Sequence, residues 1–119
     1  MKNTLVLGAS SNPSRYAYKA INRLRANGHK VIAIGIKEGK IGDVSITLGR
    51  PLIPDLHTIT LYLNPGRQKG YYDYIIELNP ERIIFNPGTE NAVLMKLAKE
   101  KGIEVEAACT LVMLSLDQY

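Results

Sequence analysis

Short apolar runs alternate with amphipathic stretches along the whole sequence, and this alternation restricts the fold more than any other feature. The runs have the length of buried strands and cover residues 4–8, 30–36, 58–64, 82–86 and 103–108. Between them, apolar residues recur at helical spacing over residues 17–24, 71–78 and 92–98. Strands that alternate with helices predict a parallel sheet with right-handed helical crossovers, the α/β doubly wound class.

The apolar content of each run predicts its place in the sheet. The runs at 4–8, 30–36 and 82–86 are nearly continuous in apolar residues, as expected for central strands covered on both faces. The runs at 58–64 and 103–108 alternate apolar with polar residues, so we expect them at the edges. Both conditions fit a five-stranded parallel sheet of order 3-2-1-4-5 in a three-layer Rossmann-like fold. The length of 119 residues suits a single domain over residues 1–119.

Residues 37–57 do not fit the alternation and are too long for an ordinary connection. Residues 43–47 have the composition of a short strand, and the rest of the segment is rich in turn-forming residues. Two interpretations remain open, an extra hairpin at the edge of the sheet or a loop that covers a ligand.

The composition excludes several classes of protein. The single cysteine, Cys109, rules out an internal disulfide framework and a cysteine-based zinc cluster. Fifteen Lys and Arg residues are scattered among eleven acidic ones, for a net charge of +4, without the basic stripe typical of nucleic-acid binding. No apolar stretch reaches the roughly 20 residues of a membrane span. We expect a soluble cytoplasmic protein with neither nucleic-acid nor membrane partners.

Three Asn-Pro pairs, at residues 12–13, 64–65 and 86–87, follow predicted strands. Asparagine can cap a helix and proline suits the first helical position, so the pairs predict helix starts. The junctions are expected together at the carboxyl edge of the sheet, where open α/β folds bind ligands. Gly8 and Gly88 would let backbone approach a ligand there.

The turn after the first strand retains only the first glycine of a dinucleotide-binding fingerprint. Gly8 is followed by the small Ala9 and by Ser10, whose hydroxyl can donate to a phosphate oxygen, and a helix start would direct amide donors to the same point. After the second strand the chain has Lys37 where an NAD enzyme usually has an acid, which disfavours NAD and suits NADP or coenzyme A. An ordinary surface lysine is an equally good interpretation of Lys37.

Residues 5–42 and 86–114, with the Gly-Ala-Ser turn, Asn-Pro and Arg15 in the first and Gly88 and Asn91 in the second, resemble the small bacterial CoA-binding-domain proteins. These are similar to the CoA-binding domain of the succinyl-CoA synthetase alpha subunit. The chain departs from the family at the end of the second strand, where Ile34, Gly35 and Ile36 replace a common Val-Asn-Pro.

The resemblance implies a set of ligand-binding positions. Gly8, Ala9 and Ser10 would lie against the CoA pyrophosphate, flanked by Asn12 and Arg15, and Lys37 would face a phosphate. The backbone at Leu63, Asn64 and Pro65 would border the adenine, and Gly88, with Asn86 and Pro87, would close the other side.

No reaction is evident in the sequence. Cys109 follows the last strand, whereas His29 and His57 precede strands, so a Cys-His pair would have to span the sheet. The leading hypothesis is a non-catalytic module that binds CoA or an acyl-CoA. One alternative is an NAD(P)-binding redox sensor or small oxidoreductase. Another is a protein-interaction module with a vestigial nucleotide crevice, which would form a homodimer or bind a protein partner through its edge strands or through Tyr71, Tyr72 and Tyr74.

Overall fold

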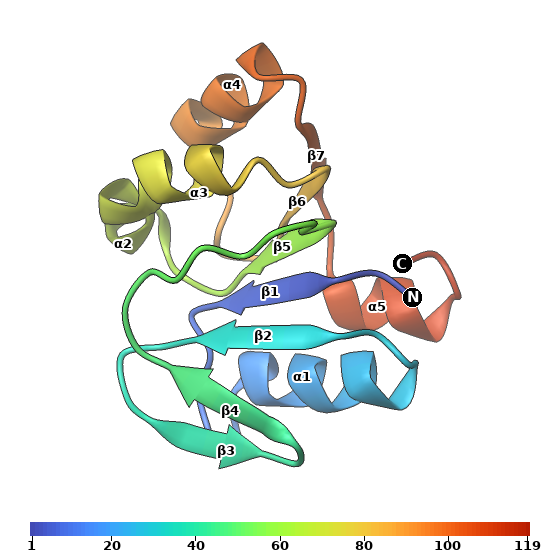
Figure 1. The fold of residues 1–119 in the computed structure, drawn as a ribbon. Helices are drawn as coiled ribbons and strands as arrows, with labels where there is room; N and C mark the ends of the chain where they lie inside the picture. Colours follow the sequence, from blue (N-terminus) through green and yellow to red (C-terminus); the bar gives the residue numbers. More distant parts are fainter.

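The computed structural model describes residues 1–119, and its elements follow the alternation predicted from the sequence (Figure 1). The strands are β1 (Thr4–Leu7), β2 (Val31–Ile34), β3 (Gly39–Ile41), β4 (Val44–Thr47), β5 (Thr58–Leu61), β6 (Arg82–Phe85) and β7 (Glu104–Ala107). The helices are α1 (Tyr16–Ala26), α2 (Pro65–Gln68), the 3-10 turn η1 (Lys69–Tyr71), α3 (Tyr72–Leu78), α4 (Ala92–Glu100) and α5 (Thr110–Ser115). The predicted α/β class is confirmed.

All the strands form one sheet in the order β3-β4-β2-β1-β5-β6-β7, and every neighbouring pair except β3 and β4 is parallel. The predicted five-stranded sheet of order 3-2-1-4-5 is therefore wrong. When only the parallel strands are numbered along the chain, their order is 3-2-1-4-5-6, that of a Rossmann sheet. The third of them is β4. The run at 58–64 forms β5, which lies centrally between β1 and β6, whereas β7 lies at an edge as predicted.

β5 is buried on both faces although its sequence alternates between apolar and polar residues. Thr58 and Thr60 are fully buried because side chains from distant parts of the chain satisfy their hydroxyls. Thr60 Oγ1 shares a hydrogen bond with Thr110 Oγ1 (2.8 Å) and accepts one from Asn86 Nδ2 (2.6 Å). Thr58 Oγ1 accepts one from Arg82 Nε (3.0 Å). A hydroxyl with such partners can be buried, so the alternation did not mark an edge strand.

Residues 37–57 contain both an edge hairpin and a crossover. β3 and β4 pair in antiparallel fashion, which confirms the hairpin interpretation. Residues 48–57 then return across the sheet to β5 without a helix, and Leu56 enters the core on the side of α3. Tyr74 Oη of α3 donates to Pro51 O (2.6 Å) and fixes this segment to the helix.

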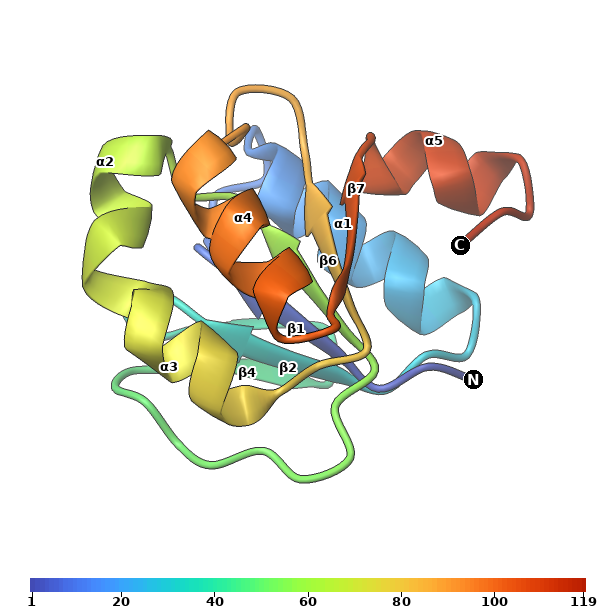
Figure 2. The same cartoon turned by 90° about the horizontal axis from the view of Figure 1, so that it is seen from above.

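The sheet is covered on both faces, which gives three layers (Figure 2). α1 and α5 lie on one face, and α2, α3 and α4 lie on the other. Because successive strand residues point to opposite faces, Leu5 and Leu7 of β1 join the core beneath α3 and α4, and Val6 joins the core beneath α1. The helices of both layers pack against the parallel strands. The carboxyl ends of these strands lie at one edge of the sheet.

Only one of the three Asn-Pro pairs expected to start helices does so. Asn64 is the N-cap of α2, its side chain accepts a backbone N–H (2.9 Å), and Pro65 is the first helical residue. The predicted starts at Asn12 and Asn86 are wrong. α1 begins later, at Tyr16, and Asn86 lies in a longer loop that ends at Asn91, the N-cap of α4.

Candidate functional site

The direction in which strands are added to the sheet changes between β1 and β5. From β1 it proceeds outward to β2 and β4, and it then returns to the other side of β1 to build β5, β6 and β7. Open α/β sheets bind ligands outside the carboxyl ends of their strands at such a switch point. A cleft of about 460 Å³ lies there, walled by the loops after β1, β2, β5 and β6.

The turn after β1 packs tightly against both neighbouring strands. Gly8 has a φ of +98°, and a Cβ at this position would approach the carbonyl carbon of Tyr62, after β5, to 2.8 Å. On the other side of the turn, Gly35 follows β2, and only a glycine fits there because a Cβ would overlap Ala9 O. The turn thus reaches both strands with a single glycine of its own, helped by a glycine on the neighbouring strand.

Hydrogen bonds between its own polar residues hold the rest of this turn. Ser10 Oγ accepts from Asn12 N (3.1 Å), and Asn12 Oδ1 accepts from Ser14 N (3.0 Å) and Ser14 Oγ (2.8 Å). Arg15 is the N-cap of α1, and no side chain caps the first N–H groups of that helix. Since Arg15 and Tyr16 line the cleft, the uncapped, positive end of α1 borders it.

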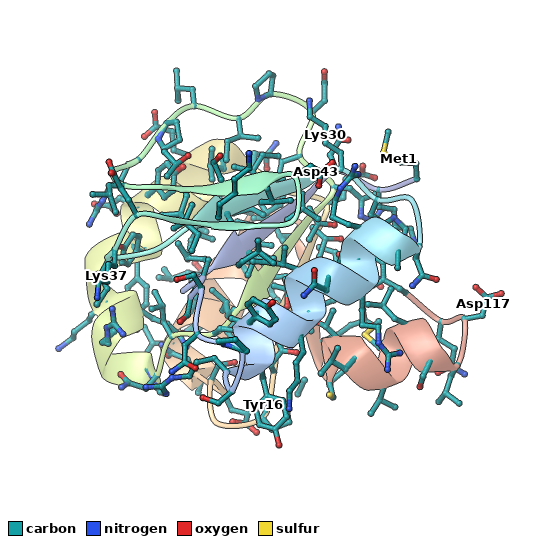
Figure 3. The ribbon with its side chains drawn as sticks, turned by 90° about the horizontal axis from the view of Figure 1, so that it is seen from below. Met1, Tyr16, Lys30, Lys37, Asp43 and Asp117 are labelled. Atoms are coloured by element: carbon teal, nitrogen blue, oxygen red, sulfur yellow. The ribbon has the colours of Figure 1, made fainter.

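Three cationic side chains line the cleft, and no carboxylate does. Arg15 comes from the start of α1, Lys37 follows β2 and Arg67 belongs to α2. Lys37 lies at the opposite end of the sheet from Met1 and Lys30 (Figure 3). Neither of the two ion pairs in the structure involves a cleft residue. The one carboxylate bonded to a lining residue is that of Glu90, whose Oε1 accepts from Gly88 N (2.8 Å) without pairing with a cation. The three unpaired cations therefore suit the cleft to an anionic ligand.

Most of the residues singled out in the sequence lie together in the lining of this cleft: Gly8, Ala9, Ser10, Arg15, Lys37, Leu63, Asn64, Pro87 and Gly88. Asn12, Pro65 and Asn86 are outside the lining. Asn12 is used within the turn and Pro65 starts α2, so both shape the walls without facing the cavity.

Asn86 is buried, and tertiary hydrogen bonds occupy its side-chain amide. Nδ2 donates to Thr60 Oγ1 (2.6 Å) and to Leu61 O (2.9 Å), while Oδ1 accepts from Thr110 N (2.9 Å). Its backbone oxygen accepts from Thr89 Oγ1 (2.7 Å). Asn86 thus fixes the loop after β6 to β5 and to α5, and this loop carries Pro87 and Gly88 into the cleft wall.

Sequence reasoning missed several lining residues, among them Tyr16, Arg67 and Tyr71. The signal for Arg67 was available, because the Asn64 cap places the first turn of α2 at the carboxyl edge of the sheet. Only the protein-interaction hypothesis gives Tyr71 and Tyr74 a role, as a contact with a partner. Tyr71 is half-buried in the cleft wall, and its neighbour Tyr74 is only 5% exposed. No sequence pattern distinguishes these two tyrosines.

The titratable groups outside the cleft do not assemble into a catalytic pair. His29 and His57 precede β2 and β5 at the amino edge, and burial lowers the pKa of both. Cys109 lies at the other edge, as the N-cap of α5. Burial also raises the pKa of Tyr62, in the cleft wall, to about 12, so its phenol is neutral at physiological pH. No group of three or more His, Cys, Asp and Glu side chains is arranged to hold a metal ion.

The sequence also matches a known protein family. Residues 2–115 match the model of the family described as the CoA binding domain. The chain belongs to the CoA-binding domain family. The resemblance predicted from its sequence is thus confirmed. No curated protein matches the chain. None of the helices in this family member is long and apolar enough to cross a bilayer.

Solved structures support the same fold. An uncharacterized protein is 48% identical, with a TM-score of 0.97, over 100% of this chain and 98% of its own. A hypothetical protein from Pyrococcus horikoshii OT3 is 23% identical, with a TM-score of 0.83, over 97% of this chain and 82% of its own. A protein from Thermus thermophilus is 22% identical, with a TM-score of 0.81, over 99% of this chain and 90% of its own. At these identities, the last two show the fold alone.

Proposed function

We propose that the chain binds coenzyme A or an acyl-CoA in the cleft at the carboxyl edge of the sheet and catalyses no reaction on it. The observation that carries this proposal is the charge of the cleft, which has Arg15, Lys37 and Arg67 in its lining, no carboxylate, and a place at the switch point between β1 and β5. CoA is a polyanion with a pyrophosphate and a ribose phosphate. Membership of the CoA-binding domain family supports the same ligand.

The turn between β1 and α1 is the proposed pyrophosphate site. Gly8, Ala9 and Ser10 present little side-chain bulk, so a phosphate can approach the backbone. The uncapped first turn of α1 offers N–H donors and the positive end of the helix dipole, a combination that suits phosphate. Arg15 can add two parallel donors from its guanidinium. Asn12 would act indirectly, by holding the turn in shape.

Lys37 is proposed to face a phosphate from the side of β2. An NAD enzyme places an acid near this position to accept hydrogen bonds from ribose hydroxyls. Here Gly35 and Ile36 precede an exposed lysine that has no ion-pair partner. A cation at this point suits a phosphorylated ribose, a feature that CoA shares with NADP, so the experiment must separate these two ligands.

The remaining walls are proposed to hold the adenosine part of the ligand. The backbone at Leu63 and Asn64 lies on one side of the cleft, and Pro87 and Gly88 lie on the other. Asn86, whose amide is occupied, would contribute by fixing the second wall. In the same way Pro65 would contribute by starting α2.

A thermal-shift experiment with a panel of nucleotides tests the proposal. A ligand that binds only the native state raises the melting temperature. CoA and acetyl-CoA are expected to raise it at micromolar to millimolar concentration, and NADP and NAD to raise it less. A larger shift with NADP would favour the NAD(P)-binding alternative, and the absence of any shift with millimolar CoA would reject the proposal.

Two further measurements test the rest of the proposal. Native mass spectrometry of freshly purified protein is expected to show a CoA-type mass on the chain, and it reports the number of chains per particle at the same time. Acetyl-CoA incubated with the protein is expected to remain intact by mass spectrometry. Steady consumption of acetyl-CoA, in proportion to protein added, would show that the chain is an enzyme.

A further inference from the structure

The side of the cleft formed by α2 and η1 carries positive charge that lies apart from the turn after β1. Arg67 of α2 and Tyr71 of η1 both line the cleft. They follow β5, whereas Lys37 follows β2, and β1 lies between those strands in the sheet. The cations of the cleft therefore approach a ligand from two different sides.

Arg50 extends the charge on this second side. It belongs to the extended crossover between β4 and β5, and its guanidinium carbon lies 4.5 Å from the centre of the Tyr71 ring. The same crossover is tied to α3 by the hydrogen bond from Tyr74 Oη to Pro51 O (2.6 Å), one residue along. Stacking on an aromatic ring orients a guanidinium while it leaves the N–H donors of its edge free.

Neither Arg50 nor Arg67 has a carboxylate partner, since both ion pairs of the structure involve other residues. The Arg50 guanidinium contacts the face of the Tyr71 ring, and the hydrogen bond that Arg67 makes to Asn64 comes from its backbone N–H. Arg50 is outside the lining of the cleft and reaches this side through its contact with Tyr71, which is in the lining. An anion bound near both guanidinium groups would offset their weak mutual repulsion in water. Their planar donors match the oxygens of a phosphate or a carboxylate.

We infer that Arg67 and the Arg50–Tyr71 pair form a second anion subsite of the cleft, an inference that rests on the proposed CoA-type ligand. The subsite would bind an acidic group of the ligand other than its pyrophosphate. Two sources supply such a group. One is the phosphate on the ribose of CoA, which would then lie on this side of the cleft while Lys37 faces the pyrophosphate. The other is a carboxylate at the end of a dicarboxylic acyl chain. In either case Arg50 and Arg67 determine which CoA compound binds best.

Isothermal titration calorimetry on two matched pairs of ligands tests this subsite. CoA is compared with dephospho-CoA, and succinyl-CoA with butyryl-CoA, so that each pair differs at a single acidic group. In the wild-type protein, the acidic member of at least one pair is expected to bind about tenfold more tightly, as expected for charge-assisted hydrogen bonds. The pair that shows the difference identifies the source of the acidic group.

The variants Arg50→Ala and Arg67→Ala are expected to bring that ratio close to one. Affinity for the member that lacks the acidic group should fall less than affinity for the acidic member, because the turn after β1 is untouched. Tyr71→Phe, which retains the ring, should keep the ratio, and Tyr71→Leu should reduce it. Arg23→Ala, which removes an exposed charge from the last turn of α1, is the matched control.

The possible results separate the inference from the proposed function. If the wild-type protein binds CoA but discriminates within neither pair, or if the ratio survives in both arginine variants, the subsite is wrong and the proposed function stands. If no CoA compound binds the wild-type protein, the proposed function itself fails, and the subsite fails with it.

Discussion

Both edges of the sheet carry basic residues, but the two edges use them differently. At the amino edge, Arg82 is only 5% exposed, and protein groups engage its guanidinium. Nε donates to Thr58 Oγ1 (3.0 Å), Nη1 pairs with Glu106 (3.5 Å), and the group stacks on Tyr119 at 4.5 Å from the ring centre. Only Nη2 is buried without a partner. Arg82 therefore joins β5, β7 and the last residue into one packed unit.

At the carboxyl edge, the cations face a cavity. Arg15, Lys37 and Arg67 are exposed and have no acidic partner. A basic residue with protein partners, such as Arg82, stabilises the fold, and one without them is available to bind a ligand. Its partners in the structure, more than its place in the sequence, distinguish the two roles. Substitutions at the two edges should accordingly separate loss of stability from loss of affinity.

The largest effect is expected at the carboxyl edge, from Gly8→Ala. Unlike the other substitutions at this edge, it should reduce both stability and affinity. The new Cβ would meet the Tyr62 carbonyl carbon at 2.8 Å while the backbone holds a φ of +98°. We expect a loss of about 2–4 kcal/mol in the free energy of unfolding, together with loss of CoA binding. Gly28→Ala is the control, because Gly28 has a similar φ of +81° and open space around its Cβ position, and should cost about 1 kcal/mol. Urea denaturation measures both, and equal losses would contradict the close contact with Tyr62.

The next effect is expected at the amino edge. Arg82→Ala removes a buried side chain and leaves the Thr58 hydroxyl without its donor, so we expect a loss of about 2–3 kcal/mol. Arg82→Met should cost less, since it keeps the aliphatic volume and removes the unpartnered Nη2. Both variants should bind CoA with unchanged affinity by calorimetry under conditions where they are folded. A weaker affinity would show that the two edges are coupled.

A smaller effect is expected from Arg15→Ala and Lys37→Ala. Both side chains are exposed, so the free energy of unfolding should change by less than about 0.5 kcal/mol. The Kd for CoA should rise about tenfold in each variant, because a charge-assisted hydrogen bond to phosphate is lost. Calorimetry measures the Kd, with Arg23→Ala as the control of equal charge. Unaltered affinity in both variants would show that neither side chain contacts a phosphate of the ligand.

The smallest effect concerns the histidines of the amino edge. Burial lowers the pKa of His29 and His57 below the ordinary value of 6.5, and His29 Nδ1 accepts a hydrogen bond from Lys2 N (2.9 Å) that protonation would break. Between the lowered pKa and 6.5, the histidines bind more protons in the unfolded chain than in the folded one, so the free energy of unfolding rises with pH. Their contribution to stability is fully present above pH 6.5 and is lost as the pH falls below it. The melting temperature of the free protein should therefore fall as the pH drops from about 7.5 to 5.5. The double variant His29→Gln, His57→Gln should flatten this slope, and a slope that persists would assign the effect to other groups.

The sequence alone predicts the parallel architecture and the position of the cleft, because both follow from local patterns. Alternating apolar runs and helices imply a carboxyl edge, and the residues after the strands at Gly8, Lys37 and Gly88 lie there by necessity. The predicted homodimer or protein partner is a separate matter and stays a prediction.

The order of the strands could not be predicted in the same way. The alternation in β5 reflects polar residues whose partners, such as Asn86 and Thr110, lie more than 20 residues away along the chain. Residues 43–47 have the composition of a short strand, but no local pattern indicates that β4 pairs in parallel with β2. The stacking of Arg50 on Tyr71 likewise joins two segments that are neighbours only after the crossover between β4 and β5 has formed.

The unpaired cations of the cleft also have a kinetic consequence. Arg15, Lys37 and Arg67 surround one cavity without a carboxylate, so their fields add at its mouth and draw a polyanion inward before contact. At physiological ionic strength such fields act over about 8 Å, which is enough to guide the last step of an encounter. The association rate of CoA, followed by stopped-flow measurements, should therefore decrease steeply with added salt, while its dissociation rate changes much less.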